Sequence, residues 1–249
     1  MPRAAPILKV HQLGVVFPDS NGGLRALDQV SFEICPREFV CVLGASGSGK
    51  TTLLRTLAGL LPPTTGNVVF AGGRTARIGM VFQQSNLMPW RTVMGNIALP
   101  LELGDLSVEA ASRRAQEMIE LVGLQGFEES LPRDLSGGMA QRVAIARAFV
   151  HDPDLLLLDE PFGSLDALTR ERMGVELSRI WQKRRKTVVM VTHSITESLY
   201  LADRVLVLTP RPGTIKLDLD VDLPRPRTDE VKFTAHFGRL ARKLKQALE

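Results

Sequence analysis

The sequence predicts an α/β protein in which helices flank a mainly parallel sheet, with a small antiparallel β subdomain and a helical subdomain. Short apolar runs alternate with segments of helical periodicity along most of the 249 residues, which is typical of parallel strands connected by helices. The run Phe39–Leu43 is apolar on both faces, as a central strand of a parallel sheet should be, and it leads directly into a glycine-rich segment. The hydrophobic content of 44% and the charged content of 23% are ordinary for a chain that buries a core, which disfavours a disordered or fibrous protein.

The other strands are expected from alternation with period two or from short buried runs. Ile7–Phe17 and Val30–Ile34 alternate in this way, and the turn-rich Pro18–Gly23 between them predicts an antiparallel pair. The further expected strands are Val68–Phe70, Ile78–Phe82, Leu155–Leu158, Val188–Val191, Val205–Leu208 and Thr214–Leu217.

Helices are expected where the apolar residues recur at steps of three and four. This pattern between Thr92 and Leu131 predicts a helical insert, and a further helix is expected at about Ala167–Gln182. The prolines of Leu223–Arg227 predict an extended linker, which a short basic helix follows.

The net charge of +4 is concentrated at the C-terminal end. We expect one domain over residues 1–223, with its helical subdomain at about 92–150, and a basic C-terminal tail at 224–249. The tail holds seven basic and three acidic residues, so the rest of the chain is balanced and offers no basic face for nucleic acid. Two alternatives stay open for the tail, a contact with a neighbouring molecule and a solvated helix.

The composition also predicts the compartment. No apolar run approaches the roughly 18 residues of a membrane span, and the first ten residues do not resemble a signal peptide, so we place the protein in the cytosol. Cys35 and Cys41 are too few for a disulfide framework or a four-ligand zinc site, and we expect buried free thiols.

The segment Gly44–Thr51 matches the pattern G-x-x-x-x-G-K-[ST] between a buried strand and a helix. Glycines let consecutive backbone N–H groups curl around phosphate oxygens, and the helix that begins near Gly49 directs its positive end at the same anion. Lys50 would neutralise the β- and γ-phosphates, and Thr51 would offer its hydroxyl to Mg²⁺. A plain glycine turn is the alternative. The expected ATP-binding residues are Gly44, Ala45, Ser46, Gly47, Ser48, Gly49, Lys50, Thr51 and Thr52.

Two adjacent acids, Asp159 and Glu160, end the apolar run Leu155–Leu158. Ligands of open α/β sheets bind at the carboxyl edge of the strands, so Asp159 can hold Mg²⁺ and Glu160 can face the attacking water. Such a pair taken alone is as often a solvated part of a loop. Together with the phosphate loop, it predicts metal-assisted hydrolysis of a nucleoside triphosphate.

The segment Leu135–Arg142, with the sequence LSGGMAQR, distinguishes this chain from other proteins with a phosphate loop. It resembles the LSGGQ signature of ATP-binding cassette (ABC) ATPases, and the resemblance covers about Ile7–Leu223, with the motifs in the family's order. Gln83 matches the glutamine loop of the family, Ser164–Asp166 its D-loop, and His193 its switch histidine.

The resemblance implies a role for each of these residues. Phe17 stands where the family places an aromatic residue under adenine, with a core position as the alternative. His193 would bond the γ-phosphate, with a structural imidazole as the alternative. The catalytic residues would be Glu160, His193, Gln83 and Lys50, and the ligands of Mg²⁺ would be Thr51, Gln83 and Asp159.

The resemblance also implies a dimer, in which two copies of the chain would enclose two ATP molecules head to tail. The residues that bind the ATP of the other copy would be Ser136, Gly137, Gly138 and Asp166.

Two positions depart from the family pattern. Met139 replaces the usual glutamine of the signature, so a polar contact from that side chain is missing while the backbone donors remain. Pro36–Arg37 stands where relatives have a glycine-containing turn, at a position remote from the phosphates. We expect activity to survive the replacement by Met139.

Further segments resemble one subfamily, the importer ATPases for nitrate, sulfonates and taurine. These segments are Gln83–Val93, Leu158–Arg170, Pro210–Ile215 and Asp222–Arg227. The 86 residues from Lys50 to Ser136 leave no room for the long coiled coil of chromosome-maintenance relatives, and a single set of motifs disfavours the two-cassette ribosome-associated proteins.

The expected function is therefore the ATP-hydrolysing subunit of a bacterial inner-membrane importer for a sulfonate, taurine or nitrate. It would act at the cytoplasmic face as a homodimer, bound to an integral-membrane permease and indirectly to an extracytoplasmic solute-binding protein. Leu87, Met88, Pro89 and Trp90 form an apolar patch suited to dock a short permease helix, with a core position of Trp90 as the alternative. The alternative function is a soluble ABC ATPase acting on DNA, ribosomes or an assembly factor. A regulatory module without turnover is disfavoured because Glu160 and His193 are present.

Overall fold

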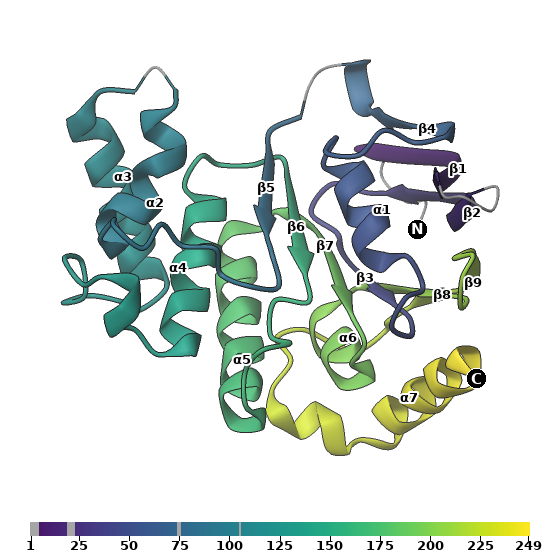
Figure 1. Cartoon of the computed structure of the whole chain (residues 1–249). Coiled ribbons are helices and arrows are strands. Elements are labelled where there is room, and N and C mark those ends of the chain that lie inside the picture. The colour runs from purple at the N-terminus through teal and green to yellow at the C-terminus, as the bar shows by residue number, and fades with distance from the viewer. Residues whose placement is uncertain (1–4, 19–22, 74–75, 105) are drawn as a thin grey trace. The chain divides into compact units, whose positions relative to one another are not determined.

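The chain divides into two compact units, of which the first is discontinuous in sequence. The computed structural model describes residues 5–18, 23–73, 76–104 and 106–249. The first unit comprises Met1–Ala76 and Lys186–Glu249, and the second comprises Arg77–Arg185. Figure 1 shows the helices and strands of both units.

The first unit contains seven strands among its described residues. They are β1 (Leu8–Phe17), β2 (Leu24–Ile34), β3 (Phe39–Leu43), β4 (Thr65–Phe70), β7 (Thr187–Thr192), β8 (Arg204–Leu208) and β9 (Ile215–Asp220). Its α-helices are α1 (Lys50–Leu57), α6 (Ile195–Leu201) and α7 (Ala235–Leu248), and its 3₁₀ helices are η1 (Ala71–Gly73) and η3 (Asp229–Phe233).

A small antiparallel sheet has the strand order β2-β1-β4. Val10 of β1 pairs with Phe32 on one side and with Val68 on the other. The expected antiparallel pairing of the first two strands is confirmed, and the strand expected near Val68 is the third member. The turn expected at Pro18–Gly23 includes residues 19–22, which lie outside the described residues.

The larger sheet of the first unit has the order β7-β3-β8-β9. β3 is parallel to β7 and to β8, whereas β9 is antiparallel to β8. All five side chains of Phe39–Leu43 are fully buried, as the apolar sequence predicts for a central strand. Cys41 on this strand is a buried free thiol, as expected, whereas the free thiol of Cys35 is only half-buried.

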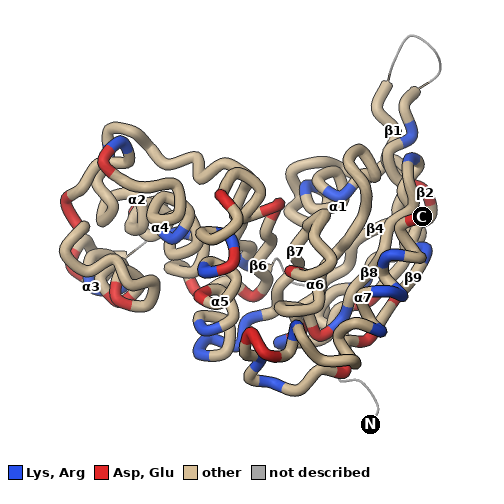
Figure 2. Tube along the Cα trace, turned by 90° about the horizontal axis from the view of Figure 1, so that it is seen from below, with Lys and Arg blue, Asp and Glu red and all other residues tan. Residues whose placement is uncertain are grey.

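The C-terminal segment of the first unit is folded. The three apolar residues of α7 that are buried, Phe237, Leu240 and Leu244, lie on one face, because they recur at steps of three and four. This helix contacts α6 and β8. Figure 2 shows basic residues along α7, and Arg239 and Arg242 among them are exposed.

The second unit combines two parallel strands with helices. The strands are β5 (Ile78–Val81) and β6 (Leu155–Asp159), and they pair in parallel. The helices are α2 (Val93–Glu102), α3 (Val108–Leu121), η2 (Pro132–Asp134), α4 (Gly137–Phe149) and α5 (Ala167–Arg184). The helical insert expected between Thr92 and Leu131 is confirmed as α2 and α3. Thr92 and Ser107 cap them by accepting hydrogen bonds from Gly95 N and Ala110 N.

Both units agree with the predicted α/β class, since three of the strand pairings in the larger sheets are parallel and the antiparallel sheet is separate. Within the described part of the chain, no helix has the length and the apolar character that a membrane crossing requires.

Candidate nucleotide-binding site

The residues predicted for the site divide between the two units. The phosphate loop, Phe17 and His193 belong to the first unit. Gln83, Asp159, Glu160, the signature segment and Asp166 belong to the second unit.

The phosphate loop joins β3 to α1, as the sequence predicts. Gly47 and Gly49 adopt φ values of 79° and 91°, a left-handed conformation that glycine adopts without steric cost. At Gly44, a Cβ atom would lie 2.5 Å from Oγ of Ser48, so a side chain there would deform the loop. The sequence therefore places glycine where the backbone must curl, and α1 begins directly after Gly49 with no side-chain cap.

Lys50 lies inside the curve of the loop. Its side chain is only 5% exposed, and Nζ donates hydrogen bonds of 3.0 Å to the carbonyl oxygens of Gly44 and Ala45. The ammonium group is thus fixed at the centre of the loop, where it can neutralise an anion that the loop amides surround.

His193 lies at the same edge of the sheet as the phosphate loop. Leu43 and Thr192 are partners in the parallel strands β3 and β7, so the residues that follow them, Gly44 and His193, continue from neighbouring strand ends. The His193 side chain is exposed. Within the first unit, the structure therefore brings together two of the predicted elements of the site.

The residues around His193 are fixed by local hydrogen bonds. The hydroxyl of Thr192 donates to Oε2 of Glu197 at 2.7 Å and accepts from Ser194 N at 3.0 Å. Ser194 caps α6 by accepting from Glu197 N at 3.2 Å. The position of the imidazole is consequently tied to the first turn of α6.

Phe17 is the last residue of β1 and is 38% exposed, so the alternative of a core position is wrong. An exposed ring at a strand end can stack on a planar base. The contact with adenine stays a prediction.

The turn between β8 and β9 contacts the phosphate loop and supports its backbone, although no motif of the sequence indicates this role. Nε of Arg211 donates to the carbonyl oxygen of Gly47 at 3.3 Å. Gly213 N donates to Ala26 O at 2.9 Å. A Cβ atom at Gly213 would collide with the carbonyl oxygen of Ser48. No local signal in the sequence indicates which loop the segment between these two strands contacts, because the partners are distant in sequence.

We expect Gly213→Ala to weaken ATP binding about tenfold, because its methyl group must displace the backbone of the phosphate loop, and overpacking of this kind costs about 1–3 kcal/mol. Gly238→Ala on α7 is the matched control, since a Cβ atom there meets open space. Titration with a fluorescent ATP analogue measures both dissociation constants. Equal affinity of the two variants would mean that this turn does not set the shape of the loop.

In the second unit, Gln83 and the two acids lie at one sheet edge. Val81 and Leu158 are partners in the parallel strands β5 and β6, so Gln83 and Asp159 continue from neighbouring strand ends. A Cβ atom at Gly163 would lie 3.3 Å from Nε2 of Gln83 and 3.4 Å from the carbonyl oxygen of Glu160. Gln83 therefore lies beside the turn that follows Glu160.

The acids have different surroundings. Asp159 is 6% exposed, whereas Glu160 is half-buried and adopts a φ of 42°, in the left-handed region that non-glycine residues seldom occupy. Unusual backbone conformations of this kind cluster at functional sites. The buried carboxylate suits a metal ligand, and the more open one suits contact with water.

Mg²⁺ binds hard oxygen ligands, and the predicted set consists of such ligands. Thr51 offers a hydroxyl oxygen in the first unit, and Gln83 and Asp159 offer an amide oxygen and a carboxylate in the second. The carboxylate of Asp159 is nearly buried, and a bound cation offsets the cost of burying a negative charge. These residues fit Mg²⁺ by their chemistry.

The signature segment begins α4. Ser136 is the N-cap and accepts a hydrogen bond from Met139 N at 3.3 Å, so the methionine that replaces the usual glutamine keeps its backbone contact. Gly138 is buried, and a Cβ atom there would lie 2.9 Å from the methyl carbon of Thr169 on α5. Asp166 caps α5 by accepting from Thr169 N at 3.0 Å, and hydrogen bonds with the side chain and the backbone of Thr169 hold the pKa of its carboxyl below the ordinary value.

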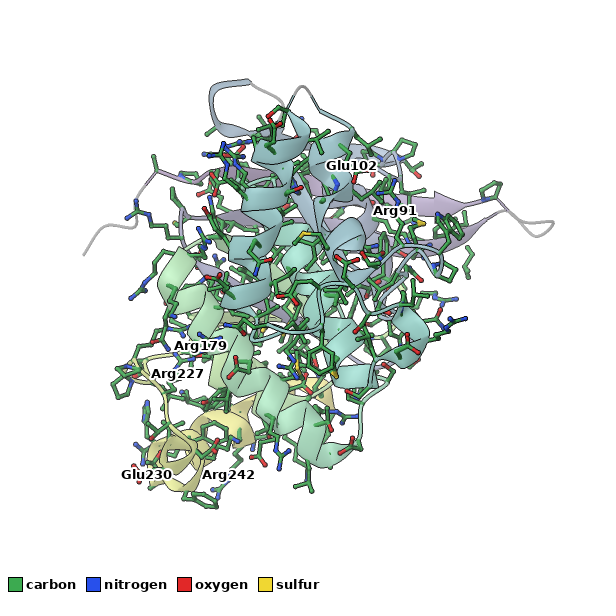
Figure 3. All side chains as sticks on the ribbon, turned by 90° about the vertical axis from the view of Figure 1, so that its left-hand side faces the viewer. Arg91, Glu102, Arg179, Arg227, Glu230 and Arg242 are labelled. Carbon is green, nitrogen blue, oxygen red and sulfur yellow. The ribbon has the colours of Figure 1, made fainter. Side chains whose placement is uncertain are left out.

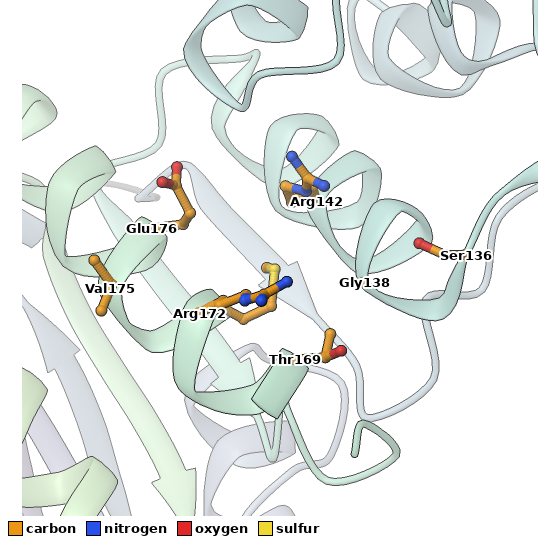
Figure 4. A pocket seen from close by; sticks show the side chains of 8 residues that line it. Ser136, Gly138, Arg142, Thr169, Arg172, Val175 and Glu176 are labelled. Atoms are coloured by element: carbon orange, nitrogen blue, oxygen red, sulfur yellow. The ribbon is translucent and has the colours of Figure 1, made fainter. Parts of the chain in front are cut away.

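The N-termini of α4 and α5 thus lie next to each other, and a pocket of about 460 Å³ opens beside them. Figure 4 shows Ser136 at the start of α4 and Thr169 on α5. The pocket is lined by Ser136, Gly138, Arg142, Thr169, Arg172, Met173, Val175 and Glu176. The N-terminus of α4 and two arginines favour negative charge at this face, whereas Glu176 adds one acidic group to it.

The loop from Gln83 to Thr92 is held from inside the second unit. Asn96 is fully buried: its Oδ1 accepts from Met88 N at 2.8 Å and its Nδ2 donates to the carbonyl oxygens of Met88, Arg91 and Thr92. Trp90, by contrast, is 74% exposed, so the alternative that it belongs to the core is wrong. Figure 3 shows Arg91 beside Glu102, and the ion pair between them measures 2.7 Å.

Comparisons with known proteins agree with the motifs. The family model described as "ABC transporter" matches residues 27–163. The taurine import ATP-binding protein TauB of Rhizobium johnstonii is 43% identical, over 97% of this chain and 96% of its own length. The nitrate import ATP-binding protein NrtD of a Synechocystis strain is 44% identical over 92% and 90%. The aliphatic sulfonates import ATP-binding protein SsuB of Bacillus cereus is 39% identical over 97% and 96%.

Among solved structures, the chain is similar to the ATP-binding cassette MJ0796 in a dimeric, post-hydrolysis state bound to ADP and Pi. The TM-score is 0.76 at 32% sequence identity, and the match covers 87% of this chain and all of that one. The likeness in structure therefore extends over both units.

Proposed function

Because the chain belongs to the ABC transporter family of ATP-binding proteins, we propose that it is the ATP-hydrolysing subunit of a bacterial importer for a small solute such as taurine, nitrate or a sulfonate. The chain is an ATPase of this family. The importer assignment and the site roles below are the parts that we propose. They are supported by relatives named for import of these three solute classes and by the geometry of the loop that carries Trp90.

Hydrolysis would rest on positioning and on neutralisation of charge. Lys50 would bind the β- and γ-phosphates from the centre of the phosphate loop, and the amides of Gly44–Thr52 would surround them. Glu160 would accept the proton of the attacking water, and His193 would bond the γ-phosphate. Phe17 would stack under the adenine.

Thr51, Gln83 and Asp159 would hold Mg²⁺, which supplies a positive charge that offsets the charge of the phosphates. Gln83 would have a second role in coupling, because the loop that begins at Gln83 leads to the exposed Trp90. A change at the docking surface would thereby reach a residue of the site.

A second copy of the chain would complete the site. Ser136, Gly137 and Gly138 form the N-terminus of α4, whose backbone amides would bind phosphate oxygens of the ATP of the other copy, and Asp166 at the start of the neighbouring helix would contact the same ATP. The dimeric form of the similar cassette supports a homodimer, and the head-to-tail arrangement of its copies is part of our proposal. Release of phosphate would remove the charge that holds the copies together.

The single observation that carries the importer assignment is the loop from Gln83 to Trp90. It begins at a predicted site residue, buried Asn96 fixes its backbone, and it ends at a large aromatic side chain that is 74% exposed. Exposed aromatic residues on a fixed backbone are typical of binding surfaces for a partner. We name Leu87, Met88, Pro89 and Trp90 the coupling patch, and we propose that it docks a short helix of an integral-membrane permease at the cytoplasmic face.

The proposal is tested by purifying the tagged chain from its native cells in a mild detergent and identifying bound proteins by mass spectrometry. We expect a multi-span permease in stoichiometric amount, whose solute-binding protein is then tested with taurine, nitrate and sulfonates. Recovery of ribosomes, DNA or a soluble assembly factor without any permease would instead support a soluble ABC ATPase.

A further inference from the structure

The C-terminal end of α6 is bound by two arginines, Arg225 and Arg227, from the proline-containing segment that precedes η3 and α7. A helix leaves the last four carbonyl groups of its backbone without partners inside the helix. α6 has only seven residues, so more than half of its carbonyls need partners from elsewhere. We name Arg225 and Arg227 the arginine clamp.

Arg227 provides most of these partners. Its side chain is 4% exposed, and Nη1 donates to the carbonyl oxygens of Leu199, Tyr200 and Ala202 at 2.9, 3.1 and 2.6 Å. Nη2 donates to the carbonyl oxygen of Leu223 at 3.3 Å. Burial lowers the pKa of the guanidinium to about 10, so it stays cationic at neutral pH, next to the negative end of the α6 dipole.

Arg225 binds the remaining carbonyl and connects α6 to the central strand. Its Nη2 donates to Leu201 O, and its Nε donates to Oδ1 of Asp203 at 2.8 Å. Oδ2 of the same aspartate accepts from Phe39 N at 2.9 Å, at the start of the strand that leads into the phosphate loop. The clamp therefore fixes the end of α6 relative to β3.

The opposite end of α6 carries His193. Ser194 is the N-cap, and the hydrogen bond from Thr192 to Glu197 links the strand end to the first turn of the helix. Because α6 is only two turns long, a movement of its C-terminal end moves its N-terminal end as well. Because α6 is fixed at both ends, the backbone of His193, which lies between β7 and α6, is fixed as well, and this sets the orientation of its imidazole.

The clamp residues differ from the other basic residues of the C-terminal segment. The hydrogen bonds of Arg225 and Arg227 go to backbone and side chains of the first unit, whereas Arg242 is exposed on α7. Figure 3 labels Arg227 on the segment before α7 and Arg242 on the helix itself. Mutation can therefore test the clamp arginines separately from the exposed basic residues of α7.

We propose that Arg225 and Arg227 are positioning residues for His193. They act through α6 and contact neither nucleotide nor water of the reaction. The proposal deepens the function proposed above and rests on the role given there to His193. It assigns the first part of the basic segment to the ATP site.

The test compares Arg225→Gln with Arg242→Gln as the matched control. Arg225→Gln removes one carbonyl partner and the ion pair with Asp203, while Arg227 still holds the helix, so the chain keeps its fold. We expect the kcat of ATP hydrolysis to fall about fivefold and the KM for ATP to change less than about twofold, because the contact acts on the reacting phosphate. Arg227→Lys, which keeps the charge but makes fewer hydrogen bonds, should act in the same direction. The control should change neither constant.

Two further measurements separate positioning from general destabilisation. The chain has four histidines, so the imidazole signals in an NMR spectrum can be assigned, and we expect the His193 signal to shift in Arg225→Gln and not in the control. In a double-mutant cycle, Arg225→Gln should cause no further fall in kcat once His193 is alanine.

An unchanged His193 signal in folded Arg225→Gln would overturn the proposal, and so would an equal loss of kcat with and without the histidine. If His193→Ala retains the full rate while the His193 signal still shifts in Arg225→Gln, the catalytic role of His193 fails and the positioning by the clamp stands. If His193→Ala is inactive and the signal does not shift, the role of His193 stands and the clamp fails.

Discussion

Glu160→Gln is expected to lower the rate of ATP hydrolysis by about 10² to 10⁴, with ATP affinity retained. The amide has nearly the size of the carboxylate and fits the same backbone, which at this residue has a φ of 42°. It cannot accept the proton of the attacking water, so only the chemical step is lost. Because Glu160 follows β6 and not the phosphate loop, the groups that bind the nucleotide are unchanged.

The variant should also accumulate as a dimer with ATP bound. Phosphate release measures the rate, and size-exclusion chromatography with and without ATP measures the dimer. Glu129→Gln is the matched control, since it makes the same chemical change at an exposed position of the second unit. Turnover at the rate of the unaltered chain would remove Glu160 from its role as general base.

The phosphate loop could be predicted from the sequence because its determinants are local. Phe39–Leu43 is apolar at every position, and Gly47 and Gly49 stand where the backbone has a left-handed conformation. Both signals lie within about ten residues of each other, and both act on the chain conformation directly. The capped start of α4 at Ser136 is predictable for the same reason.

The arginine clamp could not be predicted, because its contacts are distant in sequence. Arg227 binds carbonyls 25 to 28 residues before it, and carbonyl groups are present at every residue, so no pattern marks the partners. The composition of residues 224–249 indicated only an excess of charge, which a solvated helix explains equally well. α6 was missed as well, since seven residues are too few for helical periodicity to emerge.

Asn96 is a second example of a residue whose role depends on its surroundings. Asparagine within a helix is ordinarily unfavourable, and nothing in the sequence distinguishes this one from a solvated side chain. In the structure it is fully buried and makes four hydrogen bonds with the backbone of residues 88–92. The sequence could therefore indicate that Met88 and Trp90 are apolar, but not which of the two is exposed.

The coupling patch leads to the second large effect. We expect the double variant Met88→Ala, Trp90→Ala to lose solute transport by roughly 30-fold or more, because truncating an aromatic residue central to an interface costs about 2 kcal/mol or more. Basal ATP hydrolysis of the isolated chain should stay within about twofold. Trp90 is 74% exposed without a partner protein, so its removal leaves no large cavity, and Met88 binds Asn96 through backbone atoms that alanine keeps.

Transport is measured as ATP-driven uptake in vesicles that contain the permease, and hydrolysis is measured on the chain alone. Leu103→Ala is the matched control, since Leu103 is 83% exposed in the same unit and lies outside the coupling patch. Transport at the unaltered rate in the double variant would show that the permease docks elsewhere. If ATP hydrolysis by the isolated chain falls together with transport, the loop acts on the site through Gln83 without any partner. Only the loss of transport with hydrolysis retained identifies the patch as the place where ATP hydrolysis is coupled to a partner.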